Sequence, residues 1–163
     1  MAKFHTFKLG EDYLLRLSRL RTGSTEIIKK AIYQGADVVA DAIKESIYAL
    51  PEEPYRKLRP GELFNGVSQT QKEGIADGFG LTDMEPDGKG WNTKAGFDGY
   101  IPGTESKKYP KGLPVLLLAR SIESGSSVRR KYPFVRKAVN AVRREAIETM
   151  ERVIDEEIQK TMK

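Results

Sequence analysis

The spacing of apolar residues predicts helices near both ends of the chain. Between residues 24 and 50, apolar residues and one glycine recur at steps of three and four, which is one face of an α-helix. These positions are Ile28, Ile32, Gly35, Val39, Ala42, Ile43, Ile47 and Leu50. A shorter helix is expected over Glu11–Leu20. We expect Gly23 to end it and Ser24 or Thr25 to cap the longer helix that follows.

A second long helix is expected at the C-terminal end, with Pro133 at its first position, where the missing N–H is not needed. Its apolar stripe consists of Val135, Val139, Val142, Ala146, Met150, Val153 and either Glu157 or Ile158. The acidic interruption near Glu157 indicates that this end leaves the core or meets a partner. A short helix is expected over Leu116–Ser124, with Gly125 in a left-handed conformation as its stop.

Glycine and proline separate these helices. Residues 51–114 contain seven of the eight prolines and eleven of the fifteen glycines, which favours strands and loops over helix. The segments that most resemble strands are Lys89–Tyr100, with three aromatic residues among glycines, and Gly74–Leu81.

These patterns predict an α+β fold. A long N-terminal helix and a long C-terminal helix pack on a small antiparallel sheet, and the middle of the chain forms an extended loop or hairpin. We expect one domain, residues 1–163, which is helical over 10–50, rich in glycine and proline over 51–114, and helical again over 115–163.

Composition excludes several classes of chemistry. Cysteine is absent and His5 is the only histidine, so the chain has no disulfide, thiolate metal site or histidine-dependent triad. No apolar run approaches the roughly 20 residues that a membrane span needs, and the first residues lack the apolar core of a signal peptide. The balance of 28 Lys and Arg against 23 Asp and Glu gives a net charge of +5. We expect a protein of the reducing cytoplasm that is not an enzyme.

One acidic stretch partly matches a calcium loop. Oxygen ligands alternate from Asp83 and a glycine follows at Gly88, but the twelfth position, which needs a glutamate, is Lys94. Pro86 and Asp87 before the glycine are typical of a turn, which is the favoured interpretation. No metal site is predicted.

Two other features also fall short of a site. The glycine pairs Gly78–Gly80 and Gly88–Gly90 complete neither a dinucleotide nor a phosphate-loop pattern, so turns and hairpin twist explain them better. Glu52 and Glu53 lack a partner for acid–base work and are expected in a solvated loop. No catalytic or cofactor-binding residue is predicted, and no cofactor.

A basic cluster is more informative. Between Arg129 and Arg144 there are seven cations and no acid, and acidic residues follow. Cations near a helix N-terminus oppose the helix dipole, which costs a few tenths of a kcal/mol each. This cost suggests a partner, either an acidic protein surface or a phosphate backbone. The plainer interpretation is a solvated face, with basic and acidic ends paired between neighbouring subunits. The candidate interface residues are Arg129, Arg130, Lys131, Lys137, Arg143 and Arg144.

The same region carries a motif. It consists of an alanine, then a glutamate shortly before Gly-Ser, then a basic loop. The sequence Pro-Phe-hydrophobic-Arg-x-Ala follows and opens the last helix. These features fall on Ala119, Glu123, Gly125, Ser126, Pro133, Phe134, Val135, Arg136 and Ala138. The motif resembles that of neck or tail-completion (head–tail joining) proteins of siphophages. The chain departs from it at Lys137, where proline is common, and at 60–63, where Pro-Gly-Glu-Leu replaces Thr-Gly-x-Leu.

The resemblance implies a non-enzymatic structural protein of the virion, made in the bacterial host cytoplasm and located at the tail or neck of a long-tailed bacteriophage or prophage. Its expected partners are copies of itself in an oligomeric ring, a hexamer in the virion, neighbouring neck and tail proteins, and DNA in transit through non-specific contact. No membrane partner is expected. The alternative is a small basic nucleic-acid-binding module. A hydrolase is a third and weaker hypothesis.

The motif also has a physical interpretation. Glu123 is expected to accept hydrogen bonds from N–H groups of the turn after Gly125. Pro133 starts the last helix, Phe134 inserts into the core, and Arg136 reaches back to Glu123 across the loop. These residues are expected to fix a loop against a helix and form no reaction centre.

Overall fold

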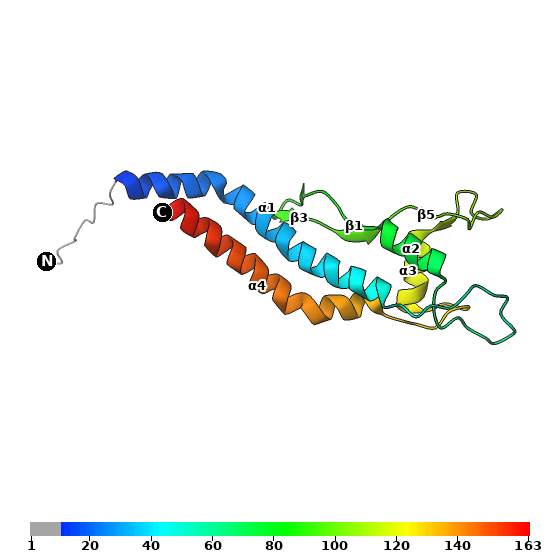
Figure 1. Cartoon of the computed structure of the whole chain (residues 1–163). Coiled ribbons are helices and arrows are strands. Elements are labelled where there is room, and N and C mark those ends of the chain that lie inside the picture. Colours follow the sequence, from blue (N-terminus) through cyan, green and yellow to red (C-terminus); the bar gives the residue numbers. More distant parts are fainter. Residues whose placement is uncertain (1–10) are drawn as a thin grey trace.

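The computed structural model describes residues 11–163, and two long helices dominate it. α1 (Glu11–Tyr48) and α4 (Phe134–Met162) run side by side in opposite directions, and we call them the helix pair. Residues 49–133 fold mainly at one end of the pair, with Trp91 reaching back to Lys29 in the middle of α1, and we call them the α/β end. The start of α1 and the end of α4 lie together at the far end of this elongated molecule (Figure 1). His5 lies outside the described residues.

The α/β end contains two short helices and six short strands. α2 (Gln69–Gly78) comes before the strands, and α3 (Val115–Ser124) follows them. The strands are β1 (Phe79–Leu81), β2 (Glu85–Pro86), β3 (Trp91–Asn92), β4 (Ala95–Phe97), β5 (Tyr100–Ile101) and β6 (Leu113–Pro114). They form three antiparallel pairs, β1 with β4, β2 with β3, and β5 with β6. The expected α+β class is confirmed.

α1 does not stop at Gly23, as the sequence predicted, but continues through it as one helix. The hydroxyls on either side do not cap a new helix. Thr22 Oγ1 donates to the Ser18 carbonyl at 2.9 Å and Ser24 Oγ to the Arg21 carbonyl at 3.0 Å. Such bonds to the preceding turn occupy the hydroxyls within the helix and often bend it. Figure 1 shows α1 changing direction between its dark-blue and lighter-blue parts.

The predicted strand over Gly74–Leu81 is wrong for its first five residues, which belong to α2. Ser68 begins this helix with a capping box: its hydroxyl accepts from the Gln71 N–H, and the Gln71 side chain accepts from the Ser68 N–H. Gly74 is buried against Ile101, so the glycine serves close packing inside a helix. The other predicted strand, Lys89–Tyr100, is divided among β3, β4 and β5, with a positive φ at Gly99 between the last two.

The main core lies where the helix pair meets the α/β end. Its largest fully buried side chains are Phe134, Ile43, Ile47, Ile75, Ile101, Ile122, Val67 and Val115. Phe134 is 0% exposed and meets Phe97 edge-on at a centroid distance of 6.1 Å, which links α4 to β4. Away from this core, α1 and α4 approach closely through small residues. Gly35 lies against the Met150 side chain, and a Cβ at Gly35 would lie 3.1 Å from the Ala146 carbonyl oxygen.

Among the described helices, none combines the length and the apolar content needed to cross a bilayer.

Candidate interaction surface

The segment between α3 and α4 is a fixed corner. α3 begins at Val115, one residue before the expected start, and Gly125 follows it with a φ of 79°. Ser126 and Arg129 close the next turn through hydrogen bonds in both directions, at 2.9 and 3.4 Å. The corner is also tied to its surroundings, because the Tyr132 N–H donates to the Ile122 carbonyl at 2.7 Å.

Glu123 caps α4. Its two carboxylate oxygens accept the N–H groups of Val135, at 2.9 Å, and Arg136, at 3.1 Å. These groups are in the first turn, where a helix has no internal acceptors, and a negative charge is favourable there. The expected acceptor role towards the Ser126–Ser127 turn is therefore wrong. The contact with Arg136 uses its backbone, while its side chain is exposed.

Arg129 is not a surface residue, which corrects its assignment to the interface. It is 7% exposed, and its guanidinium donates to the Gly66 carbonyl and to Gln71 Oε1, the latter at 3.4 Å. The guanidinium also lies 5.4 Å from the centre of the Phe64 ring. Burial lowers the pKa of Arg129, and the charge of Glu53 partly opposes this. Arg129 therefore holds the corner onto the loop over residues 51–67.

That loop has its own brace. Glu53, predicted as solvated, accepts the N–H groups of Asn65 at 2.6 Å and Gly66 at 3.0 Å. These bonds, led by Asn65, lower the pKa of Glu53. Arg56 pairs with Glu62 at 2.8 Å and with Glu53 at 3.5 Å. The loop is therefore held by carboxylate-to-backbone bonds that charge patterning alone does not indicate.

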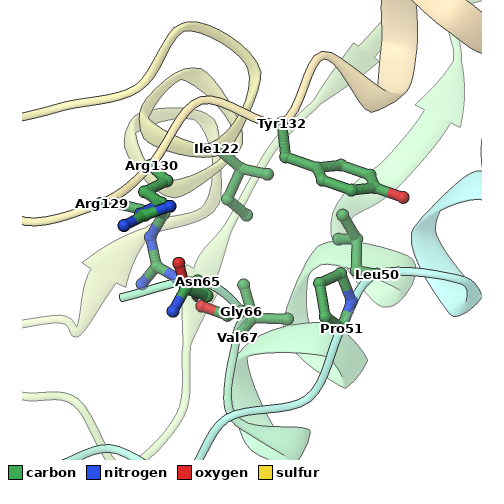
Figure 2. Close-up of a pocket in the computed structure, with 9 residues that line it drawn as sticks. All are labelled: Leu50, Pro51, Asn65, Gly66, Val67, Ile122, Arg129, Arg130 and Tyr132. Atoms are coloured by element: carbon green, nitrogen blue, oxygen red, sulfur yellow. Dashed lines mark hydrogen bonds between the residues drawn. The ribbon is translucent and has the colours of Figure 1, made fainter. Parts of the chain in front are cut away.

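Figure 2 shows the cavity between this loop and the corner, with Arg129 on one side and Tyr132, Leu50 and Pro51 on the other. It encloses about 10 Å³, which is roughly the room one water needs. Arg129 Nε is buried with no protein partner in the described chain. The cavity is too small for a substrate and has room for about one water molecule.

The remaining cations of the predicted interface are exposed. Arg130 and Lys131 lie in the corner, and Lys137 is in the first turn of α4, 5.5 Å from the Tyr132 ring centre. Arg143 and Arg144 lie about two turns further along the helix. Arg144 pairs with Glu148 on its own helix at 2.7 Å. The single cluster predicted from the sequence is therefore divided into a buried brace, a basic corner and a basic stretch of α4.

The acidic stretch is a turn, as favoured from the sequence. Asp87 accepts the N–H groups of Lys89 at 2.9 Å and Gly90 at 2.8 Å, and Gly88 has a φ of 80°. The Lys89 bond is the main reason why the pKa of Asp87 is lowered. Glu52 pairs with Lys72 at 3.0 Å. Within residues 11–163, no three His, Asp or Glu side chains are grouped as metal ligands.

Comparison with family models, with curated proteins and with solved structures found no match for this chain.

Proposed function

We propose that this chain is a structural, non-enzymatic protein of the neck of a long-tailed phage or prophage. It joins or completes the tail and assembles as a ring of identical subunits, a hexamer in the virion. The supporting observation is the corner between α3 and α4, where the motif residues work together. Gly125 turns the chain, Glu123 caps α4, and Phe134 fixes the helix in the core. The motif residues thus fix the direction in which α4 leaves the corner, which supports a structural role for them.

The basic corner is the proposed contact with an acidic neighbour in the neck or tail. Arg130, Lys131 and Lys137 are exposed and close in sequence, and none has an ion pair within the described chain. Reversed charges there would face like charges across the interface, which costs several kcal/mol. The fold should tolerate the change, because surface substitutions away from caps and core shift stability by about 0.5 kcal/mol or less.

The test uses the phage or prophage that carries the gene. Deleting the gene should leave filled heads and separate tails in electron micrographs, and the wild-type chain should restore joined particles. A triple variant, Arg130→Glu with Lys131→Glu and Lys137→Glu, should have the circular dichroism spectrum of the folded wild type but fail to restore joining. The matched control reverses three other exposed lysines, Lys44, Lys89 and Lys94, and should restore it. Intact virions without the gene would overturn the proposal.

The alternative, a nucleic-acid-binding module, loses support from the burial of Arg129 and from the pairing of Arg144 with Glu148. It predicts affinity for duplex DNA that falls steeply with salt, and fluorescence anisotropy with the wild-type chain and the triple variant tests it.

A further inference from the structure

The solvent-exposed side of α4, which we call its outer face, has a divided charge pattern. All four charged residues from Arg136 to Arg144 are cations. From Glu145 to Glu156, five of the six charged residues are acids, with Arg152 as the exception. Ile147 lies near the boundary and is 49% exposed, a large apolar side chain among charged ones. Asn140, Arg143, Ile147 and Glu151 line one shallow hollow along this face.

This order of charges is unfavourable for a helix on its own. Cations in the first half and acids in the second half both oppose the helix dipole. The ion pairs within the helix do not compensate well. Arg144–Glu148 and Arg152–Glu156 place the cation before the acid, which is the weaker orientation for pairs four residues apart. A neighbouring helix that runs in the opposite direction would reverse the balance, since its acidic half would lie beside the basic half of α4.

The inner face of α4 already shows such an arrangement. α1 runs antiparallel to α4 (Figure 1), and two of its cations meet the C-terminal, negative end of α4. Lys30 pairs with Glu157 at 2.6 Å, and the Arg16 guanidinium donates to the Met162 carbonyl at 2.5 Å. The outer face carries the same polarity of charge, and its charged residues from Arg136 to Glu156 are exposed.

We propose that the outer face of α4 binds the same face of a second copy, with the two helices antiparallel and Ile147 at the two-fold axis. In this arrangement a residue that follows Ile147 lies opposite one that precedes it by the same number of positions. Glu151 of one copy then lies opposite Arg143 of the other, and the two Ile147 side chains contact each other. A parallel pair would place cations against cations, so charge selects the antiparallel one.

The area of the outer face of α4 limits the affinity of the proposed dimer. From Arg136 to Gln159 the face is about 35 Å long at 1.5 Å per residue, and a helix is about 10 Å wide. The projected area is therefore roughly 350 Å² per copy, below the roughly 800 Å² of a standard interface. We expect a weak, salt-sensitive dimer rather than a permanent one.

This pairing goes beyond the proposed ring. A two-fold contact closes on two copies, whereas a ring needs a contact between two different faces. The dimer is measured on the purified chain and head–tail joining on the virion, so either proposal can fail while the other stands.

The first test uses the absence of cysteine from the chain. Ile147→Cys should form a disulfide-linked dimer under mild oxidation at least about tenfold faster than Leu116→Cys. Leu116 is the matched control, since it is 50% exposed but lies on α3. Raising the salt from about 0.1 M to about 1 M shortens the screening length from about 10 to about 3 Å and should remove most of the difference. Equal rates for the two variants would overturn the proposal.

The second test separates charge pairing from chance collision. An acidic variant carries Ile147→Cys with Arg143→Glu and Arg144→Glu, and a basic variant carries Ile147→Cys with Glu148→Lys and Glu151→Lys. Each should cross-link poorly with itself, because like charges then face each other. Mixed together, they should give mainly the heterodimer, which mass spectrometry distinguishes. A statistical mixture of the three dimers, or heterodimer formation that salt does not affect, would overturn the proposal.

Discussion

The helix pair and the α/β end are held together in different ways. Along the pair, α1 and α4 contact each other over much of their length through small and flexible side chains, such as Gly35 against Met150. At the α/β end, the two short helices and the strands pack on the main core, while single side chains hold the loop over residues 51–67. Glu53 and Arg129 both bind the segment around Gly66. Contacts are thus distributed along the pair, whereas the loop over residues 51–67 depends on a few positions.

The same substitution, glycine to alanine, should have its most different effects on stability in the two regions. A Cβ at Gly66 would overlap the carbonyl of Pro51, a backbone group that cannot move away. Gly66→Ala should therefore lower the free energy of unfolding by about 1–3 kcal/mol, the usual cost of overpacking. A Cβ at Gly35 would instead overlap mainly the flexible Met150 side chain, with the Ala146 carbonyl oxygen in tight contact at 3.1 Å, and alanine gains about 1 kcal/mol over glycine within a helix. Gly35→Ala should therefore change stability by less than about 1 kcal/mol.

Urea unfolding followed by circular dichroism measures both values. Gly80→Ala is the control at the α/β end, because a Cβ there would meet nothing within 4 Å and Gly80 does not have a positive φ. A larger loss at Gly35 than at Gly66 would contradict the comparison.

A smaller effect is expected where the two regions join. Glu123 belongs to the α/β end but caps α4, so Glu123→Ala leaves the Val135 and Arg136 N–H groups without their carboxylate. We expect a loss of about 1 kcal/mol, as for other helix caps. Hydrogen exchange should show the loss as faster exchange in the first turn of α4. Glu45→Ala, at an exposed position on α1, is the control. Unchanged exchange at Val135 and Arg136 would show that Glu123 does not stabilise the first turn of α4.

The same contrast explains what the sequence could predict. Periodicity predicted the long C-terminal helix and placed Gly35 on the buried face of the N-terminal one, because many positions contribute to each pattern. The burial of Phe134 followed from the motif around Pro133. Prediction from the sequence failed at Gly23, where a single breaker residue did not outweigh helix continuity. It also failed over residues 74–78, where the Ser68–Gln71 capping box was the available signal.

The site residues show the limit more sharply. Arg129 and Arg130 are adjacent and chemically identical, yet Arg129 is buried and Arg130 is exposed. Which of them faces inward depends on contacts with Gly66 and Phe64, more than sixty residues earlier in the chain. Local charge patterning does not contain that information. The same holds for Glu53, whose acceptor role depends on the loop closing back on residues 65–66.

The smallest expected effect is the pH-dependent stabilisation of the helix pair by Glu157. Hydrogen bonds from Lys160 and then Lys30 lower the pKa of Glu157 from its usual 4.5 to about 2. A pKa lowered by folding stabilises the protein fully above about pH 4.5, and that contribution is lost as the pH falls to about 2. Glu157→Gln should therefore have a lower Tm than the wild type near pH 6, and the Tm values of the two proteins should converge near pH 2.

Glu26→Gln, which removes the exposed pair with Lys29 within α1, is the control for lost charge. The gap is expected to be small, because Glu157 and its partners meet at the solvent-facing margin of the pair, where water screens each charge. A difference in Tm between Glu157→Gln and the wild type that stayed constant from pH 6 to pH 2 would mean that the charge of the Glu157 carboxylate, paired with Lys160 on α4 and Lys30 on α1, does not stabilise the fold.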